Sequence, residues 1–170
     1  QRDRWPTPVE FRPESSFDAQ DFHDRLIEDR LSANGIMGRY SESGPGPVIT
    51  DWKVLNEPIH ESYYADTFVE AGIYENEVDA LADYFIRADS LRSDSVLSIN
   101  EFNILNSGSD NDVIEYRDLV NNLLAAGAPI DRIGVQAHMS RNDVTKADIV
   151  RRINILAETG LGVEITKFDA

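Results

Sequence analysis

Short apolar segments alternate with longer amphipathic segments along most of the chain, and this alternation limits the fold more than any other sequence feature. Four apolar runs are too short for helices and are bounded by turn residues, so they predict buried strands. These predicted strands are 52–55, 95–100, 133–138 and 162–166. Apolar residues at helical spacing predict helices over 18–40, with an interruption at Gly35, and over 75–92, 112–126 and 145–160. Strands that alternate with amphipathic helices are typical of a parallel sheet, so the predicted fold class is α/β.

The acidic composition limits the classes of partner. The 170 residues include 31 acidic and 16 basic side chains, which gives a formal net charge of −15. A nucleic acid or an anionic membrane surface usually binds to a basic face, so we expect neither as a partner. The chain has no cysteine, its three histidines are widely separated, and it has no glycine-rich phosphate loop. We therefore expect no metal site and no cofactor.

Polar residues end each predicted strand. They are Asn56 and Glu57, then Asn100 to Asn103, then Gln136 and His138, and finally Lys167 and Asp169. The carboxyl ends of parallel strands form the ligand face of α/β proteins, so we expect one shared site there. Side-chain alternation places Gln136 with His138 on one face, and Lys167 with Asp169 on one face. Glu164 has the opposite parity to Lys167, so we expect it to point toward the helices.

Glu57 is the most informative of these residues. It directly follows a predicted buried strand and lies between Asn56 and Pro58. A carboxylate beside an amide at the end of such a strand suits general acid/base catalysis at a glycosidic oxygen. A glutamate that merely begins a loop in an acidic protein is the alternative.

Together the strand-end segments resemble the family 10 glycoside hydrolases, the endo-β-1,4-xylanase family. The matching segments are WKVLNEP at 52–58, SINEFN at 98–103, IGVQAH at 133–138 and ITKFD at 165–169. The resemblance implies a (β/α)₈ TIM barrel, of which residues 1–170 form a part with about strands 4 to 7 and their helices. Residues 1–15 contain three prolines and are expected to form an extended loop.

The resemblance also implies a function. The family cleaves β-1,4-xylan and xylo-oligosaccharides with retention of configuration, needs no cofactor and is usually secreted, so an extracellular location is expected. Glu57 matches the acid/base, and Asn56 matches the amide that bonds the 2-hydroxyl of the sugar. Asn100 lies in an NDYN-like segment of the family, from which Glu101 and Phe102 depart.

Position 167 departs from the family pattern at the nucleophile. The family has a glutamate where this chain has Lys167, while Gln136 and His138 match residues around it. Asp169 matches the carboxylate that pairs with that histidine. A retaining enzyme needs two carboxyl groups about 5–5.5 Å apart. A protonated lysine cannot attack the anomeric carbon, and its positive charge repels the developing oxocarbenium charge. Although nearby in sequence, Glu164 is not accepted as a substitute because of its parity.

We therefore expect this chain not to hydrolyse xylan. A complete barrel takes about 250 residues, so part of it is missing. The two open sheet edges then favour self-association of the isolated chain. The alternatives are a xylo-oligosaccharide-binding protein that lost its nucleophile, and a clan relative that acts on another β-1,4-glycan.

Overall fold

The computed structural model describes residues 18–42, 44–139 and 143–169. Its helices are α1 (Ala19–Leu31), α2 (Ile36–Arg39), α3 (Tyr63–Glu70), α4 (Glu77–Leu91), α5 (Asn111–Ala125) and α6 (Lys146–Ala157). Its strands are β1 (Asp51–Asn56), β2 (Val96–Glu101), β3 (Arg132–His138) and β4 (Gly162–Asp169). Within these ranges, no helix has both the length and the apolar character needed to cross a membrane. The extended loop expected at 1–15 lies outside the described residues.

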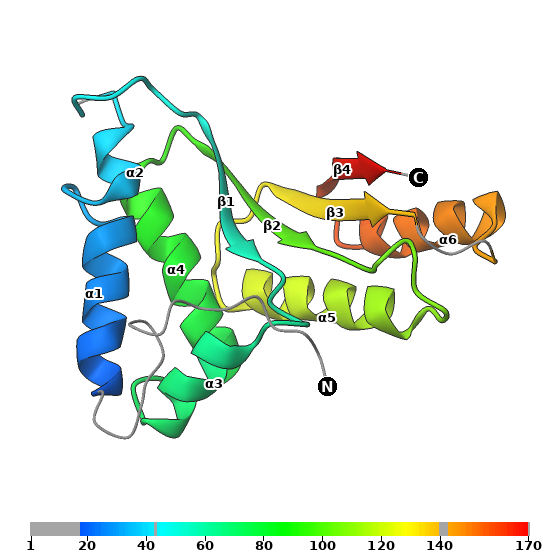
Figure 1. Ribbon diagram of the computed structural model, residues 1–170, viewed down its shortest axis with the longest axis horizontal. Coiled ribbons are helices and arrows are strands. Elements are labelled where there is room, and N and C mark those ends of the chain that lie inside the picture. Colours follow the sequence, from blue (N-terminus) through cyan, green and yellow to red (C-terminus); the bar gives the residue numbers. More distant parts are fainter. Residues whose placement is uncertain (1–17, 43, 140–142, 170) are drawn as a thin grey trace.

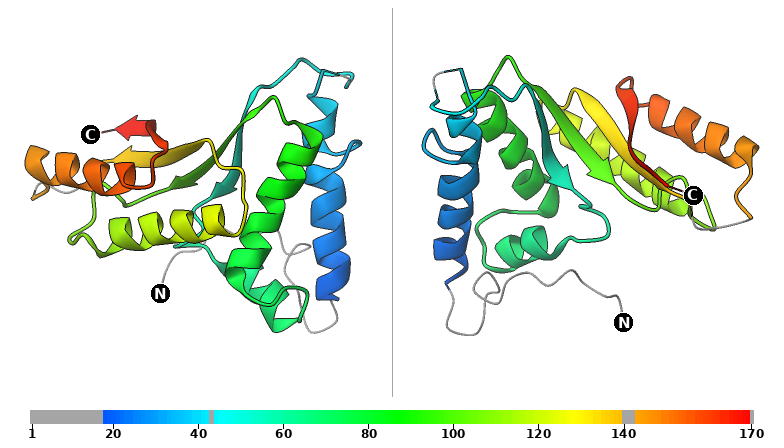
Figure 2. Two further views of the ribbon diagram at one scale, coloured as in Figure 1. Left: turned by 180° about the vertical axis from the view of Figure 1, so that it is seen from behind. Right: turned by 45° about the horizontal axis from the view of Figure 1, so that its top comes forward.

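The four strands form one parallel sheet in the order β1-β2-β3-β4, so each strand pairs with the next along the chain. Helices connect the strands, and α5 and α6 lie side by side along the same side of the sheet (Figures 1 and 2). The prediction of an α/β fold with four parallel strands is confirmed. The strand order leaves β1 and β4 at the two edges of the sheet.

The helix-facing side of the sheet is the hydrophobic core. Ile99, Ile133 and Val135 are buried there in one cluster with Phe85 of α4 and Tyr116 of α5. Each fully buried side chain of this size contributes roughly 1.5–3 kcal/mol to stability. Because side chains alternate along a strand, the residues between these point to the opposite side, which we call the inner face.

Helix α3 was not predicted from the sequence. It has only eight residues, and no side chain caps its first turn at Ser62. Helices this short are marginal on their own, so tertiary packing must stabilise α3. Phe68 of α3 supplies that packing: it is completely buried, in a cluster with Phe22 and Tyr84.

A bulge in β4 changes which of its residues share a face. Val135 pairs with Ile165, but the next residue, Gln136, pairs with Lys167. Thr166 is therefore an extra residue in β4, and alternation does not continue through it. As a result, residues on either side of the bulge with opposite parity can point to the same face.

The expectation that Glu164 points toward the helices is wrong for this reason. Its Oε1 lies 3.3 Å from Lys53 Nζ of β1, and its Oε2 lies 3.8 Å from Arg132 Nη1 of β3. Arg132 also pairs with Asp51 of β1 at 3.3 Å. These ion pairs cross the inner face between the two edge strands. Lys167 lies on that same face, nearer the carboxyl end of β4.

Candidate active site

Polar side chains from all four strands meet at the carboxyl end of the sheet, as the sequence predicted. Asn100 Nδ2 of β2 donates to Asn56 Oδ1 of β1 at 2.7 Å. Thr166 Oγ1 of β4 donates to Asn100 Oδ1 at 2.7 Å, and Gln136 Nε2 of β3 lies 3.4 Å from Asn56 Oδ1. Asn100 is only 1% exposed, so both ends of its amide need these partners. The network therefore fixes the relative positions of β1, β2 and β4.

Gly134 of β3 makes the Asn100–Thr166 contact possible. A Cβ at this position would lie 2.6 Å from Asn100 Oδ1 and 2.8 Å from Thr166 Cγ2, which is too close for either contact. The Tyr116 hydroxyl donates to the carbonyl oxygen of Gly134 at 3.1 Å. Burial raises the pKa of Tyr116 well above its usual value, so this hydroxyl stays protonated as a donor. Through this hydrogen bond, helix α5 fixes the position of β3 next to the site.

Glu57 adopts a strained backbone conformation at the end of β1, with a φ of 62°. Left-handed conformations are uncommon for residues other than glycine, and they cluster at functional sites. Its backbone N–H donates to the carbonyl oxygen of Asn100 at 2.7 Å, and its own carbonyl oxygen accepts from the N–H of Glu61 at 2.8 Å. This turn directs the side chain to β3, where Gln136 Nε2 donates to Glu57 Oε1 at 2.6 Å.

Lys167 reaches the same amide from the other side. Its Nζ donates to Gln136 Oε1 at 3.2 Å. Among the described residues, Lys167 forms no ion pair with a carboxylate. One side-chain amide therefore lies between Glu57, the predicted acid/base, and Lys167, which occupies the position predicted for the nucleophile.

His138 and Asp169 extend the group of polar contacts. His138 Nδ1 lies 2.9 Å from Asp169 Oδ2, and His138 Nε2 lies 3.1 Å from Gln136 Oε1. Both ring nitrogens thus face acceptor oxygens, so a neutral ring can satisfy only one of the two contacts. The pairing of His138 with Asp169, which the resemblance implied, is present in the structure. Both side chains are largely exposed, at 45% and 67%.

The structure thus brings together all seven residues that the sequence singled out for the site. They are Asn56, Glu57, Asn100, Gln136, His138, Lys167 and Asp169. Their catalytic and binding roles stay predictions. Thr166 belongs to the same network but was missed, because no sequence signal marks the bulge in β4. Glu164 pairs with Lys53 and Arg132 at the level of Gly134, two residues before Gln136 in β3, and lies apart from this network.

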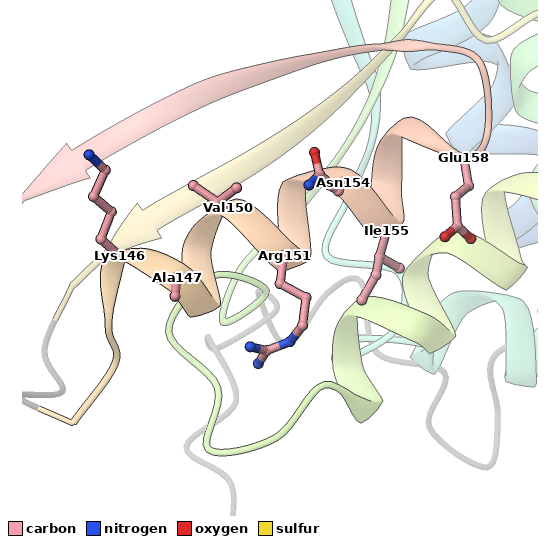
Figure 3. Close-up of a pocket in the computed structure, with 7 residues that line it drawn as sticks. All are labelled: Lys146, Ala147, Val150, Arg151, Asn154, Ile155 and Glu158. Carbon is pink, nitrogen blue, oxygen red and sulfur yellow. The ribbon is translucent and has the colours of Figure 1, made fainter.

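The hollow shown in Figure 3 lies outside this site. It has a volume of about 720 Å³ and runs along α6. Its lining residues are Lys146, Ala147, Val150, Arg151, Asn154, Ile155 and Glu158. None of the strand-end residues lines it, so it does not bring catalytic groups together. Across the described part of the chain, no cluster of three or more histidine or acidic side chains is arranged to hold a metal ion.

The four parallel strands and their helices are those of part of an α/β barrel, a class of protein whose ligand face lies at the carboxyl ends of the strands. The chain belongs to glycosyl hydrolase family 10, whose sequence model matches residues 15–170. The family resemblance and the partial barrel predicted from the sequence are confirmed.

Individual relatives agree with the family match. Endo-1,4-β-xylanase C of Paenibacillus barcinonensis is 32% identical over 145 residues, which is 79% of this chain and 13% of that protein. Endo-1,4-β-xylanase A of Thermoanaerobacterium saccharolyticum is 38% identical over 135 residues, or 77% of this chain and 11% of that protein. A solved xylanase structure from Thermoanaerobacterium saccharolyticum, a mutant in complex with xylotriose, matches with a TM-score of 0.61 and 25% identity. That match covers 89% of this chain and 43% of the solved chain, so this chain spans less than half of its relatives.

Proposed function

We propose that this chain is part of a retaining glycoside hydrolase of the endo-1,4-β-xylanase type, in which Glu57 is the acid/base and hydrolysis has been lost at position 167. The observation that carries this proposal is the Gln136 amide between Glu57 and Lys167, 2.6 Å from Glu57 Oε1 and 3.2 Å from Lys167 Nζ. It supports the assignment of Lys167 to the place of the second carboxyl group.

The chemistry explains the proposed loss. In the first step Glu57 would donate a proton to the glycosidic oxygen while a carboxylate attacks the anomeric carbon from the other side. The ammonium group of Lys167 has no lone pair for this attack. Its positive charge also opposes the oxocarbenium-like charge of the transition state.

The proposed ligand is β-1,4-xylan or a xylo-oligosaccharide. The related solved structure with xylotriose and the xylanase names of the relatives support this class. A neutral polysaccharide is also compatible with a chain of net charge −15, whereas a polyanion is not.

The experiment compares Lys167 with Lys167→Glu in a full-length protein that carries this chain, and measures the release of reducing sugar from xylan. We expect no release with Lys167 and measurable release with the Lys167→Glu variant. Lys146→Glu, the same charge change at the start of α6, is the matched control and is expected to stay inactive. Equal and substantial rates with Lys167 and with Lys167→Glu would overturn the assignment of position 167.

A binding protein is the second candidate, and the intact network around Lys167 favours it. Asn56, Asn100, Gln136 and His138 keep their hydrogen bonds although Lys167 is present. Calorimetry with xylotriose tests this candidate in the full-length protein. Binding without turnover supports it, whereas no detectable binding eliminates it. Cello- and manno-oligosaccharides in the same series distinguish a clan relative that acts on another β-1,4-glycan.

A further inference from the structure

Glu101, the last residue of β2, carries a carboxylate that is completely buried, with 0% of the residue exposed. Glutamate is almost never fully buried unless its charge is paired or hydrogen-bonded. The strand itself does not need this side chain, because β2 pairs with β3 through backbone positions up to Glu101 and Val135. The partners of the carboxylate therefore indicate what it does.

Two of the three partners of Glu101 come from the loop that follows β1. The N–H of Ile59 donates to Glu101 Oε2 at 2.9 Å, and His60 Nδ1 lies 3.0 Å from Glu101 Oε1. The third partner is the N–H of Phe102, which donates to Oε1 at 2.8 Å. Hydrogen bonds to an ionised acceptor are roughly twice as strong as those between neutral groups. Glu101 thus ties the loop after β1 to the end of β2.

Phe102 strengthens the same connection. Its ring lies against the ring of His60, with 4.3 Å between the ring centroids. Glu101 and Phe102 therefore both contact His60, one through a hydrogen bond and the other through ring packing. These are the two residues at the end of β2 that depart from the family pattern in the sequence.

The loop held in this way is the one that carries Glu57. Glu57 lies two residues before Ile59, in the left-handed conformation with a φ of 62°. A strained conformation of this kind costs about 1–3 kcal/mol and persists only where surrounding contacts enforce it. The bonds from Glu101 fix the far side of the turn, and Asn100 fixes the near side by accepting from the N–H of Glu57.

We propose that Glu101 is a positioning residue for Glu57: its buried carboxylate holds the turn at 57–61 so that the Glu57 side chain reaches Gln136 and the sugar-binding side of the sheet. This inference rests on the proposed function of Glu57 as the acid/base. Glu101 itself touches no substrate. Its effect is carried through Ile59 and His60.

The test is amide hydrogen exchange, detected by NMR, in the full chain with Lys167 retained. Glu101→Gln removes the negative charge and replaces one acceptor oxygen by a donor, so the bond from the N–H of Ile59 is either lost or becomes a weaker bond to a neutral carbonyl oxygen. We expect the amide of Ile59 to exchange about tenfold faster or more, the change expected from loss of a hydrogen bond to a charged group. Unchanged exchange at Ile59 overturns the proposal.

Asp131→Asn is the matched control. Asp131 Oδ2 accepts from the N–H of Leu97 at 2.7 Å, so it also bonds the backbone of β2, but at the opposite end of the strand. We expect this variant to leave exchange at Ile59 unchanged. If Glu101→Gln and Asp131→Asn accelerate the amide of Ile59 equally, the effect is general destabilisation and the proposal fails.

His60→Phe keeps the test decisive if Glu101→Gln does not fold. It retains Glu101 and a ring against Phe102, and removes the bond between His60 Nδ1 and Glu101 Oε1. We expect faster exchange at Ile59, by a smaller factor than with Glu101→Gln. No acceleration in this variant also counts against the proposal.

A kinetic readout separates positioning from a purely structural role. In a full-length protein made active by Lys167→Glu, Glu101→Gln is expected to lower kcat about tenfold or more with KM little changed, because a misplaced acid affects the transition state. Glu101→Asp keeps the charge and is expected to recover part of kcat. A fall in the active fraction alone, with kcat per folded molecule unchanged, contradicts positioning.

If Lys167→Glu restores no activity, the proposed function fails, while exchange at Ile59 still decides whether Glu101 holds the turn.

Discussion

Glu57 and Lys167 contact opposite ends of one side-chain amide: Gln136 donates to Glu57 Oε1 at 2.6 Å and accepts from Lys167 Nζ at 3.2 Å. The carboxylate and the ammonium group are therefore separated by a neutral group and do not form a direct ion pair. Gln136 is 2% exposed, so its position is fixed by its neighbours. This separation makes Gln136 the residue on which the geometry of the site depends.

Gln136→Met is expected to remove the bridge while nearly preserving the length of the side chain. Loss of its hydrogen bonds should lower the free energy of unfolding by about 1–3 kcal/mol. In a crystal structure we expect Lys167 Nζ to approach the Glu57 carboxylate and form a direct ion pair with it, since no amide then separates them. Gln20→Met on the exposed side of α1 is the control and is expected to be nearly neutral. Unchanged stability of the Gln136 variant would contradict the bridging role.

Gly134→Ala is expected to disturb the hydrogen bond between Asn100 and Thr166. The new Cβ would lie 2.6 Å from Asn100 Oδ1 and 2.8 Å from Thr166 Cγ2, so the bond between these residues must lengthen or break. Overpacking of this kind costs about 1–3 kcal/mol, measured by chemical denaturation. Gly162→Ala in β4 is a matched control, because nothing lies within 4 Å of its added Cβ. Equal stabilities of the two variants would refute the close fit at Gly134.

Asp110, at the start of α5, should make stability depend on pH. The guanidinium group of Arg151, and then that of Arg152, lower the pKa of Asp110 from 3.8 to about 2. A pKa that is lower in the folded state stabilises the fold above the ordinary pKa, and this stabilisation is lost as pH falls toward the folded value. We expect the stability difference between wild type and Asp110→Asn to be constant above about pH 5 and to shrink between about pH 4 and pH 2. A difference that is the same at high and at low pH would rule out this linkage.

Self-association of the isolated chain is expected at the open edge of β4. Ile165 and Phe168 on this strand are 48% and 75% exposed, and an apolar edge strand offers unpaired backbone groups to another chain. The double variant Ile165→Lys and Phe168→Lys should raise the monomeric fraction in light scattering at a given concentration. Ile114→Lys on α5 also places a lysine at an exposed apolar position, but away from both edges, and should have little effect. A wild-type chain that is monomeric and unfolds cooperatively would contradict the expectation.

The strands and their common site could be predicted from the sequence because local patterns encode them. Apolar runs that end in Asn56, Asn100 and Gln136 predicted both the sheet and the meeting of these side chains, and the hydrogen bonds confirm it. Thr145 and Asp148, three residues apart as in a capping box, form one at the start of α6. These features depend on residues only a few positions apart or on a regular strand.

The features that could not be predicted depend on long-range contacts or on a break in regularity. Helix α3 is stabilised by burial of Phe68 against Phe22, which lies far earlier in the chain. No side-chain cap at Ser62 marks the start of this helix. The bulge at Thr166 reverses the parity on which the orientation of Glu164 was predicted. Alternation holds only while a strand stays regular, so an inserted residue invalidates every orientation predicted across it.

The chemical symmetry of the Gln136 side chain has a consequence for the substitution at position 167. A half-turn about its last side-chain bond exchanges the NH₂ group and the carbonyl oxygen without displacing either end. The same glutamine can therefore face a cation or an anion at position 167. When it faces an anion, its carbonyl oxygen turns to Glu57 Oε1, so Glu57 must then carry the proton of that hydrogen bond, as a general acid does. Under the proposed function, a change from lysine to glutamate at position 167 needs a half-turn of Gln136 and a protonated Glu57, and no new side chain.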